Sequence, residues 1–450
     1  MKRICTRLVL TALVIVFAGC ASVPPREAAL IDNRALMEKE VMPSKALPST
    51  APKISSKSSL NDYLIHAALN NPGLKAAFFQ WVAALEKIPQ VTALPDPQLG
   101  YFYYVQQGVM APQGQGIAVT QTFPWFGKLQ LKGNAAADAA RAEKARYDAA
   151  QLKLFFQVKD AYYEYYYLAQ AIVVTRENLG YVKYLESVAR AGYSSGTISY
   201  ADVVQAQVEL GKLEDRVKTL NDEAEPVAAR LNAALNRPAD APLFWPEKIV
   251  EEKVSFTTSQ LLTWLKESNP DLRAIDFQAS GAKWNIALAK KDYYPDVTLG
   301  IQSFDTGRQF VPNDPVMATA SINIPIWWSK YRAEKREAMA DYKAFRRQRT
   351  DRENTLVADV KFADYKFKDA DRKIALYRDA LVPEAKQALD VSLQAYQTGK
   401  ASYANVVDAI RNLLEFELSY KRALTDREQS LAKLEMLVGR KVSLPGGSGH

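Results

Sequence analysis

The sequence predicts a mainly α-helical chain with a membrane β-barrel portion, built from two tandem helix–strand–strand–long helix–helix repeats. Three observations support this fold class. Motifs of the first half recur in the second, and long stretches contain neither glycine nor proline. In addition, four segments of about ten residues alternate between apolar and polar side chains. Apolar residues make up 48% and charged residues 24% of the 450 residues, which excludes wholesale disorder.

The amino terminus has the pattern of a secretory signal peptide, predicted over residues 1–19. Basic residues precede an apolar run over 8–18, and the small pair Ala18-Gly19 stands directly before Cys20. This arrangement resembles a bacterial lipoprotein signal, in which Cys20 becomes the lipid-attachment residue. The alternative is an ordinary signal peptide with a chance cysteine. Residues 20–59 are expected to form an acylated N-terminus and a flexible tether.

The composition and the missing motifs argue against several classes of function for this chain. Loss of the signal peptide lowers the formal net charge from +8 to +5, and no basic stripe with interleaved aromatic residues indicates nucleic-acid binding. After the signal peptide, no window approaches the roughly 20 apolar residues of a membrane-spanning helix. Two cysteines and two histidines offer little for a metal or nucleophilic site, and phosphate-loop, zinc-protease and hydrolase motifs are missing. We therefore expect no enzyme, no catalytic residues, no metal site and no cofactor beyond the lipid on Cys20.

An internal duplication is the most informative feature. Four motifs of the first half recur in order in the second: 71–74 at 269–272, 95–100 at 295–300, 123–125 at 324–326 and 193–204 at 396–407. Such regular recurrence indicates two copies of one structural unit. We assign residues 60–256 to the first repeat, residues 257–440 to the second and residues 441–450 to a flexible tail.

Each repeat contains two predicted strands. They cover about 98–106 and 116–123 in the first repeat and about 296–305 and 316–326 in the second. Their length and period-two alternation are typical of transmembrane β-barrel strands, although a half-buried sheet in a soluble domain would alternate too. The barrel interpretation predicts that Leu299, Ala318, Ala320 and Ile322 face lipid.

A long helix follows each strand pair. Residues 134–179 contain no glycine or proline, and a helix from about 129 to 191 would be roughly 95 Å long. Gly196 and Gly399 mark tight turns, after which shorter return helices are expected over about 200–235 and 403–437. Helices this long require a bundle or coiled-coil setting.

Four strands are too few to close a barrel, and an open sheet edge is not tolerated in lipid. Several chains must therefore combine their strands. A homotrimer would provide a 12-stranded β-barrel and a 12-helix α-barrel. Since the helices are too polar to cross a bilayer, we expect them to extend into the periplasm from a barrel that contacts outer-membrane lipid.

The order and spacing of these features resemble the outer-membrane efflux protein family, the TolC-like trimeric export ducts, over about residues 58–440. The segment 122–129 is similar to the heavy-metal branch of that family. The resemblance implies a passive outer-membrane duct that receives metal cations or small drugs from an inner-membrane pump through a periplasmic adaptor protein. Two alternatives remain: the exit duct of a type I protein secretion system, and a non-channel periplasmic scaffold lipoprotein.

The resemblance also implies a periplasmic gate near the helix turns. Asp408 matches an aspartate of the constriction, and Asn405 stands where a second aspartate is frequent. Asp202 and Tyr396 match a pair that holds the gate closed, while the arginine that can reinforce it is absent and Lys400 stands beside its place. Three copies of Asp408 near one axis would repel one another and attract cations. The alternative for Asp408 is an ordinary solvated position on a helix face.

Overall fold

The computed structural model describes residues 52–103, 115–246, 248–249, 251, 254–305 and 316–442. These residues form two compact units. The sheet unit contains the described residues of 78–145 and 273–350, and the tip unit contains those of 52–77, 146–272 and 351–442. The predicted lipid-attachment residue Cys20 and the tail after residue 442 lie outside the described residues.

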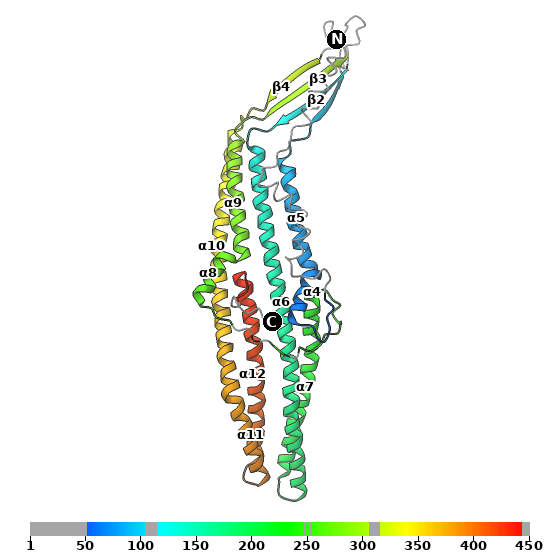
Figure 1. Ribbon diagram of the computed structural model, residues 1–450, viewed down its shortest axis with the longest axis vertical. Coiled ribbons are helices and arrows are strands. Elements are labelled where there is room, and N and C mark those ends of the chain that lie inside the picture. The colour runs from blue at the N-terminus through cyan, green and yellow to red at the C-terminus, as the bar shows by residue number, and fades with distance from the viewer. Residues whose placement is uncertain are drawn as a thin grey trace. The chain divides into compact units, whose positions relative to one another are not determined.

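The sheet unit contains one antiparallel sheet of four strands in the order β1-β2-β3-β4 (Figure 1). The strands are β1 (Gln98–Tyr103), β2 (Gln115–Phe123), β3 (Val297–Asp305) and β4 (Val316–Ile322). Each repeat provides one hairpin, and the pairing of β2 with β3 joins the two repeats. β1 and β4 consequently form the two edges of the sheet.

The two faces of the sheet differ in polarity. Leu99, Val119, Ile301 and Ala318 are paired in one row across the four strands, and residues paired in this way share a face. The same alternation places Leu299, Ala320 and Ile322 on this apolar face. The opposite face carries mainly small and polar residues: Gln98, Gly100, Ala118, Thr120, Thr122, Thr298, Gly300, Gln302, Thr319 and Ser321. The four predicted lipid-facing positions thus share one apolar face.

A buried lysine connects the strands to the first long helix, α6 (Lys128–Ser194). The Nζ atom of Lys128 lies 2.9 Å from Asp296 Oδ1 and 3.4 Å from Asp292 Oδ1, and it donates a hydrogen bond to the carbonyl oxygen of Tyr294. The backbone N–H of Trp125 donates to Asp296 Oδ1 at 2.7 Å, and the Trp125 ring stacks on Tyr294. This junction cluster ties the start of α6 to the start of β3.

The helices of the sheet unit pack against one another through alanine-rich surfaces. The side chains of Trp81 and Ile88 on α5 (Pro72–Thr92) are buried against Ala137 and Ala140 of α6. Small side chains let the helix backbones approach closely while the large α5 residues fill the space between them. In the second repeat the corresponding helices are α9 (Pro270–Lys291) and α10 (Trp328–Leu376).

The tip unit consists of helices. It contains most of α6 and the C-terminal part of α10. It also contains α4 (Leu60–Asn70), α7 (Tyr200–Ala234), α8 (Thr258–Ser268), α11 (Val382–Gln397) and α12 (Tyr403–Val438). A π-helical turn, η1 (Tyr377–Leu381), separates α10 from α11, whose second residue is Pro383. None of the helices within the described ranges is both long and apolar enough to cross a membrane.

Two asparagines show the duplication in atomic detail. Asn71 donates from Nδ2 to the carbonyl oxygen of Ala234, and Asn269 donates in the same way to Leu437. The side-chain oxygen of each accepts a hydrogen bond from the backbone N–H three residues later. Each asparagine therefore fixes the start of one helix against the end of the return helix of its own repeat.

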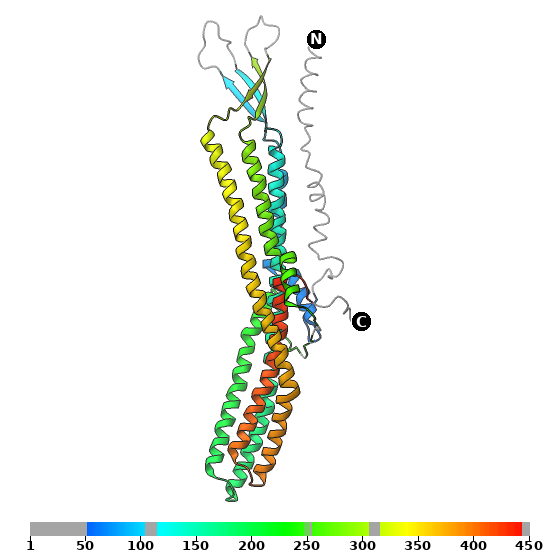
Figure 2. The ribbon, with the colours of Figure 1, turned by 90° about the vertical axis from the view of Figure 1, so that its left-hand side faces the viewer.

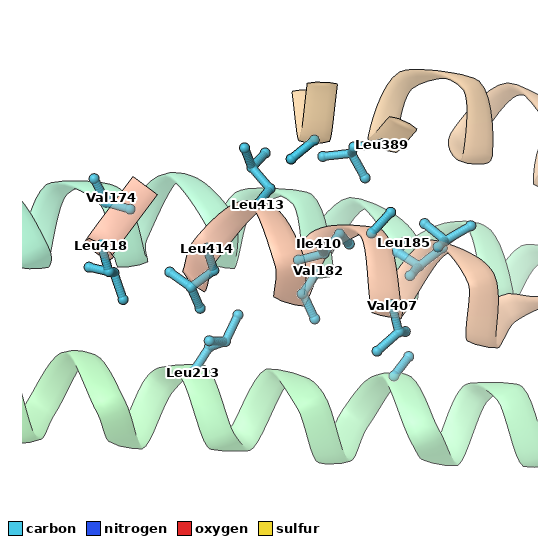
Figure 3. Close-up of a cluster of buried hydrophobic side chains, with 14 of the residues drawn as sticks. Val174, Val182, Leu185, Leu213, Leu389, Val407, Ile410, Leu413, Leu414 and Leu418 are labelled. Carbon is cyan, nitrogen blue, oxygen red and sulfur yellow. The ribbon is translucent and has the colours of Figure 1, made fainter. Parts of the chain in front are cut away.

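One large apolar cluster fills the space between α6, α7, α11 and α12 (Figure 3). Leu185, Leu389 and Leu413 are almost completely buried within it. These residues come from three different helices, so the cluster holds the two helical hairpins of the tip unit together.

Candidate gate at the helical tips

Two tight turns close the helical hairpins at one end of the tip unit (Figure 2). Gly196 has φ +75° and Gly399 has φ +72°, a left-handed conformation that glycine adopts without steric cost. The backbone N–H of Thr197 bonds to Gly192, and that of Lys400 bonds to Ala395. The two predicted turn glycines therefore end α6 and α11 in the same way.

The return helices begin with equivalent serine caps. The Ser199 hydroxyl accepts from the backbone N–H of Asp202, and the Ser402 hydroxyl accepts from that of Asn405. Ser402 Oγ also donates to Asn405 Oδ1 at 3.0 Å. The Asn405 side chain consequently holds the Ser402 hydroxyl that caps α12, a local role that accounts for a polar residue at this position.

Two buried tyrosines lie beside the caps. The rings of Tyr396 and Tyr403 pack edge to face with centroids 6.2 Å apart, and within the described part of the chain neither hydroxyl has a hydrogen-bond partner. Burial raises the pKa of the Tyr396 phenol, and the negative charge of Asp202 raises it further. Asp202 is thus close enough to influence Tyr396, although no hydrogen bond between their side chains is present among the described residues.

An ion pair that the sequence pattern did not reveal connects α7 to α12. The Arg411 guanidinium donates to both carboxylate oxygens of Glu209, including Nε to Oε2 at 3.3 Å, and Lys212 Nζ lies 2.9 Å from Oε1. Burial favours the neutral form of Glu209, but the hydrogen bonds from Arg411 and Lys212 outweigh it and lower the pKa of the carboxyl. No motif marks this pair, since its two members meet only when α7 and α12 lie side by side.

Asp408 and Lys400 are both exposed at the tip. The Asp408 side chain is 69% exposed, and its Oδ1 lies 3.6 Å from Nη1 of Arg411 one helical turn later. Lys400 forms no ion pair with any other described residue. Arg411 therefore stands between the predicted constriction residue Asp408 and the α7 carboxylate of Glu209. Within the described ranges, no cluster of three or more His, Cys, Asp or Glu side chains is placed to hold a metal ion.

The Glu209–Arg411 pair predicts a pH dependence of the tip. Because folding lowers the pKa of Glu209 from its ordinary value of 4.5, the pair stabilises the tip above that pH and loses this effect as the pH falls through the folded-state pKa. The amide hydrogen-exchange rate of residues 193–210, corrected for the intrinsic pH dependence of exchange, should therefore rise on acidification. The rise should be about fivefold for a pair worth about 1 kcal/mol. Arg411→Gln should weaken this response, because only Lys212 then remains to favour the charged form of Glu209.

Arg190→Gln is the matched control, since Arg190 pairs with Glu186 on the same helix and connects no two hairpins. It should retain the acid response. An unchanged response in Arg411→Gln would assign the pH dependence to another group.

A family profile described as "Outer membrane efflux protein" matches residues 64–237 and 261–440, one segment in each repeat. An uncharacterised protein of Haemophilus influenzae is 26% identical over 235 residues, which is 51% of this chain and 51% of that protein. The chain thus spans about half the length of this relative. The probable efflux pump outer membrane protein SepC of Pseudomonas putida is 22% identical over 350 residues, covering 73% of this chain and 68% of SepC.

Among solved structures, the outer membrane protein VceC from Vibrio cholerae has a TM-score of 0.74 at 19% identity, covering 85% of this chain and 97% of VceC. This likeness confirms the predicted mainly helical fold, and the short strands fit the same fold. The family profile confirms the resemblance found in the sequence, and the family is one of outer-membrane efflux proteins and not of enzymes. Because the profile matches both repeats and more than half of the chain, this protein belongs to the outer membrane efflux protein family.

Proposed function

We propose that this protein is the outer-membrane exit duct of a tripartite efflux system. Three copies form a passive channel that receives metal cations or small drugs from an inner-membrane pump through a periplasmic adaptor. The name of SepC, a probable efflux pump outer membrane protein, supports this assignment. Cys20 carries the lipid that anchors the amino terminus in the outer membrane.

The observation that carries the proposal is the sheet with one apolar and one polar face. Leu99, Val119, Ile301 and Ala318 form an apolar row across all four strands, and Leu99 is 76% exposed. A soluble chain gains nothing from such a face, whereas lipid stabilises it. The polar face then lines the lumen. Three sheets of four strands close a 12-stranded barrel, and the helical hairpins of the three copies form a 12-helix α-barrel.

The tip forms the periplasmic gate in this proposal. Asp408 contributes one carboxylate per copy to the constriction, Asn405 adds a neutral ring, and Asp202 and Tyr396 hold neighbouring helices in the closed position. Lys400 supplies a positive charge beside the turn. The exposed Asp408 carboxylate supports its role because a carboxylate ring attracts cations. The Tyr396 hydroxyl has no hydrogen-bond partner among the described residues, and a phenol can donate to a carboxylate such as Asp202.

Conductance in planar lipid bilayers tests the function. The purified protein should give discrete single-channel conductance steps and conduct cations in preference to anions. Asp408→Asn should lower the cation-to-anion permeability ratio at least about twofold, because three fixed negative charges are removed from a narrow constriction. Asp215→Asn, which removes an exposed carboxylate from α7, should leave the ratio unchanged. Absence of any conductance from correctly inserted protein would favour the scaffold lipoprotein.

A further inference from the structure

We propose that β4 of one copy pairs with β1 of a second copy in one defined register, and that Lys330 of the first copy binds Asp96 of the second. This inference rests on the proposed trimeric duct and specifies how its copies recognise one another. It follows from the duplication, because the chain already contains one complete example of the same junction between its two repeats.

The pairing of β2 with β3 serves as a template for the pairing between copies. β2 ends the first hairpin and β3 begins the second, and they pair antiparallel over nine residues on each strand. At the outer edges, β4 ends the second hairpin and β1 begins the first. Between two copies, β4 therefore stands in the place of β2, and β1 in the place of β3. An exposed strand edge in lipid requires such a partner.

The register follows from the equivalence of the strands. Leu99 pairs with Val119 in the first hairpin, and Leu299 pairs with Ala320 in the second. β1 and β3 are thus equivalent at an offset of 200 residues, and β2 and β4 at an offset of 201.

Applying these offsets to the β2·β3 pairs gives the pairs between copies. The pair Gln121 with Leu299 becomes Ile322 with Leu99 of the next copy. In the same way, Ile117 with Ser303 becomes Ala318 with Tyr103.

This register continues the apolar face. Ile322, Leu99 and Tyr103 are all more than half exposed in the single chain, and Ala318 is exposed as well. Side chains of paired residues lie on the same face, so the apolar face of one sheet continues into that of the next. A slip by one residue would instead place polar residues of β4 beside apolar residues of β1.

An independent observation comes from the long helices. Buried Leu154 and Val158 of α6 correspond to buried Leu356 and Val360 of α10, at an offset of 202 residues. The same offset relates Lys128 to Lys330.

The buried lysine of the junction cluster thus has a counterpart in the second repeat, and its carboxylate partner has a counterpart in the first repeat. Asp296 corresponds to Asp96 through the repeated Pro-Asp motif at the strand starts. Within the chain, Lys128 is almost completely buried and lies 2.9 Å from Asp296. The equivalent contact would join Lys330 of one copy to Asp96 of the next.

Both counterparts lack this contact in the single chain. The Lys330 side chain is 63% exposed, and the nearest carboxylate partner is Glu334 on its own helix at 3.7 Å. Asp96 is exposed and forms no ion pair with the other described residues. The complementary charges at the two outer edges therefore match the pair that is already formed at the centre of the sheet.

Cysteine cross-linking tests the register with one set of four positions. Leu99→Cys with Ile322→Cys, and Tyr103→Cys with Ala318→Cys, place thiols in the proposed pairs. Exchanging the partners gives the matched controls, Leu99→Cys with Ala318→Cys and Tyr103→Cys with Ile322→Cys. The proposed pairs fall within reach of a disulfide, whereas the crossed pairs lie about 13 Å out of register.

Oxidation of full-length protein in native membranes with copper–phenanthroline should give covalent trimers for the proposed pairs and at least about tenfold less for the crossed pairs, given the Cα separation that a disulfide allows. Stronger cross-linking of the crossed pairs would overturn the register. Cross-linking to an unrelated protein would overturn the second copy as the partner.

Light scattering of the detergent-solubilised protein separates the two levels of the proposal. A trimer in which no designed pair cross-links would refute the register and leave the duct intact. A monomer would refute the proposed trimeric function itself.

Charge reversal tests the lysine contact separately. Lys330→Glu should lower the ratio of trimer to monomer about tenfold, because two carboxylates would meet at a closed junction. Combining Lys330→Glu with Asp96→Lys should restore the trimer. Lys343→Glu, at another exposed position of α10, should have little effect. Failure of the double reversal to restore the trimer would exclude the Lys330–Asp96 contact.

Discussion

Ala318→Lys should prevent the protein from assembling in the outer membrane. Ala318 lies at the end of the apolar row formed with Leu99, Val119 and Ile301, and its side chain is exposed in the single chain. If this row faces lipid, a lysine near the bilayer midplane costs about 2–4 kcal/mol in each copy. The measurement is the yield of SDS-resistant trimer in outer-membrane fractions.

Thr319→Lys provides the matched control for this substitution. Thr319 pairs with Gly300 on the opposite, polar face, where a lysine would reach water in the proposed lumen. Its trimer yield should stay close to that of the unmodified protein. Equal yields for Ala318→Lys and Thr319→Lys would show that the two faces do not have different surroundings, and the sheet would not be a membrane barrel.

Leu413→Ala should destabilise the helical tips by about 2–5 kcal/mol, the range for removing a buried leucine side chain. Leu413 is 1% exposed and belongs to the cluster that joins the hairpin of α6 and α7 to that of α11 and α12 (Figure 3). The loss leaves a cavity between these helices. Thermal unfolding followed by circular dichroism measures the effect.

Leu413→Met keeps nearly the same volume and should cost less than about 1.5 kcal/mol. A similar cost for both substitutions would mean that Leu413 acts through its shape at one contact and not through the apolar volume that it fills.

The regular elements could be predicted because they depend on local pattern. Side chains alternate with a period of two along β3 and β4, and this alternation is visible in the letters of the sequence. The return helices were expected over about 200–235 and 403–437, and the structure has α7 at Tyr200–Ala234 and α12 at Tyr403–Val438. Both begin after a serine cap that the sequence shows directly.

The contacts between elements could not be predicted in the same way. Glu209 and Arg411 are 202 residues apart, and their meeting depends on how α7 and α12 are rotated about their axes. Lys128 and Asp296 likewise meet only because β2 pairs with β3. The π-helical turn before Pro383 depends on one wider backbone hydrogen bond, from Val382 N–H to Tyr377, for which no residue pattern is specific.

Among the predicted gate residues, too, local conformation could be predicted from the sequence and contacts between helices could not. The turn glycines Gly196 and Gly399 are recognisable because a left-handed conformation selects the residue type. The roles of Asp408 and Asp202 were inferred from resemblance, and the structure adds local partners that the resemblance did not include. Arg411 contacts both Glu209 and Asp408, so one arginine from α12 now connects the proposed constriction to α7.

Electron microscopy of the full-length protein in detergent tests the proposed duct, because the duct requires three copies around one axis. We expect end views with threefold symmetry, and side views with a short, wide membrane end that continues into a helical shaft. Monomers, or thin rods without a membrane end, would refute the duct and favour a scaffold lipoprotein.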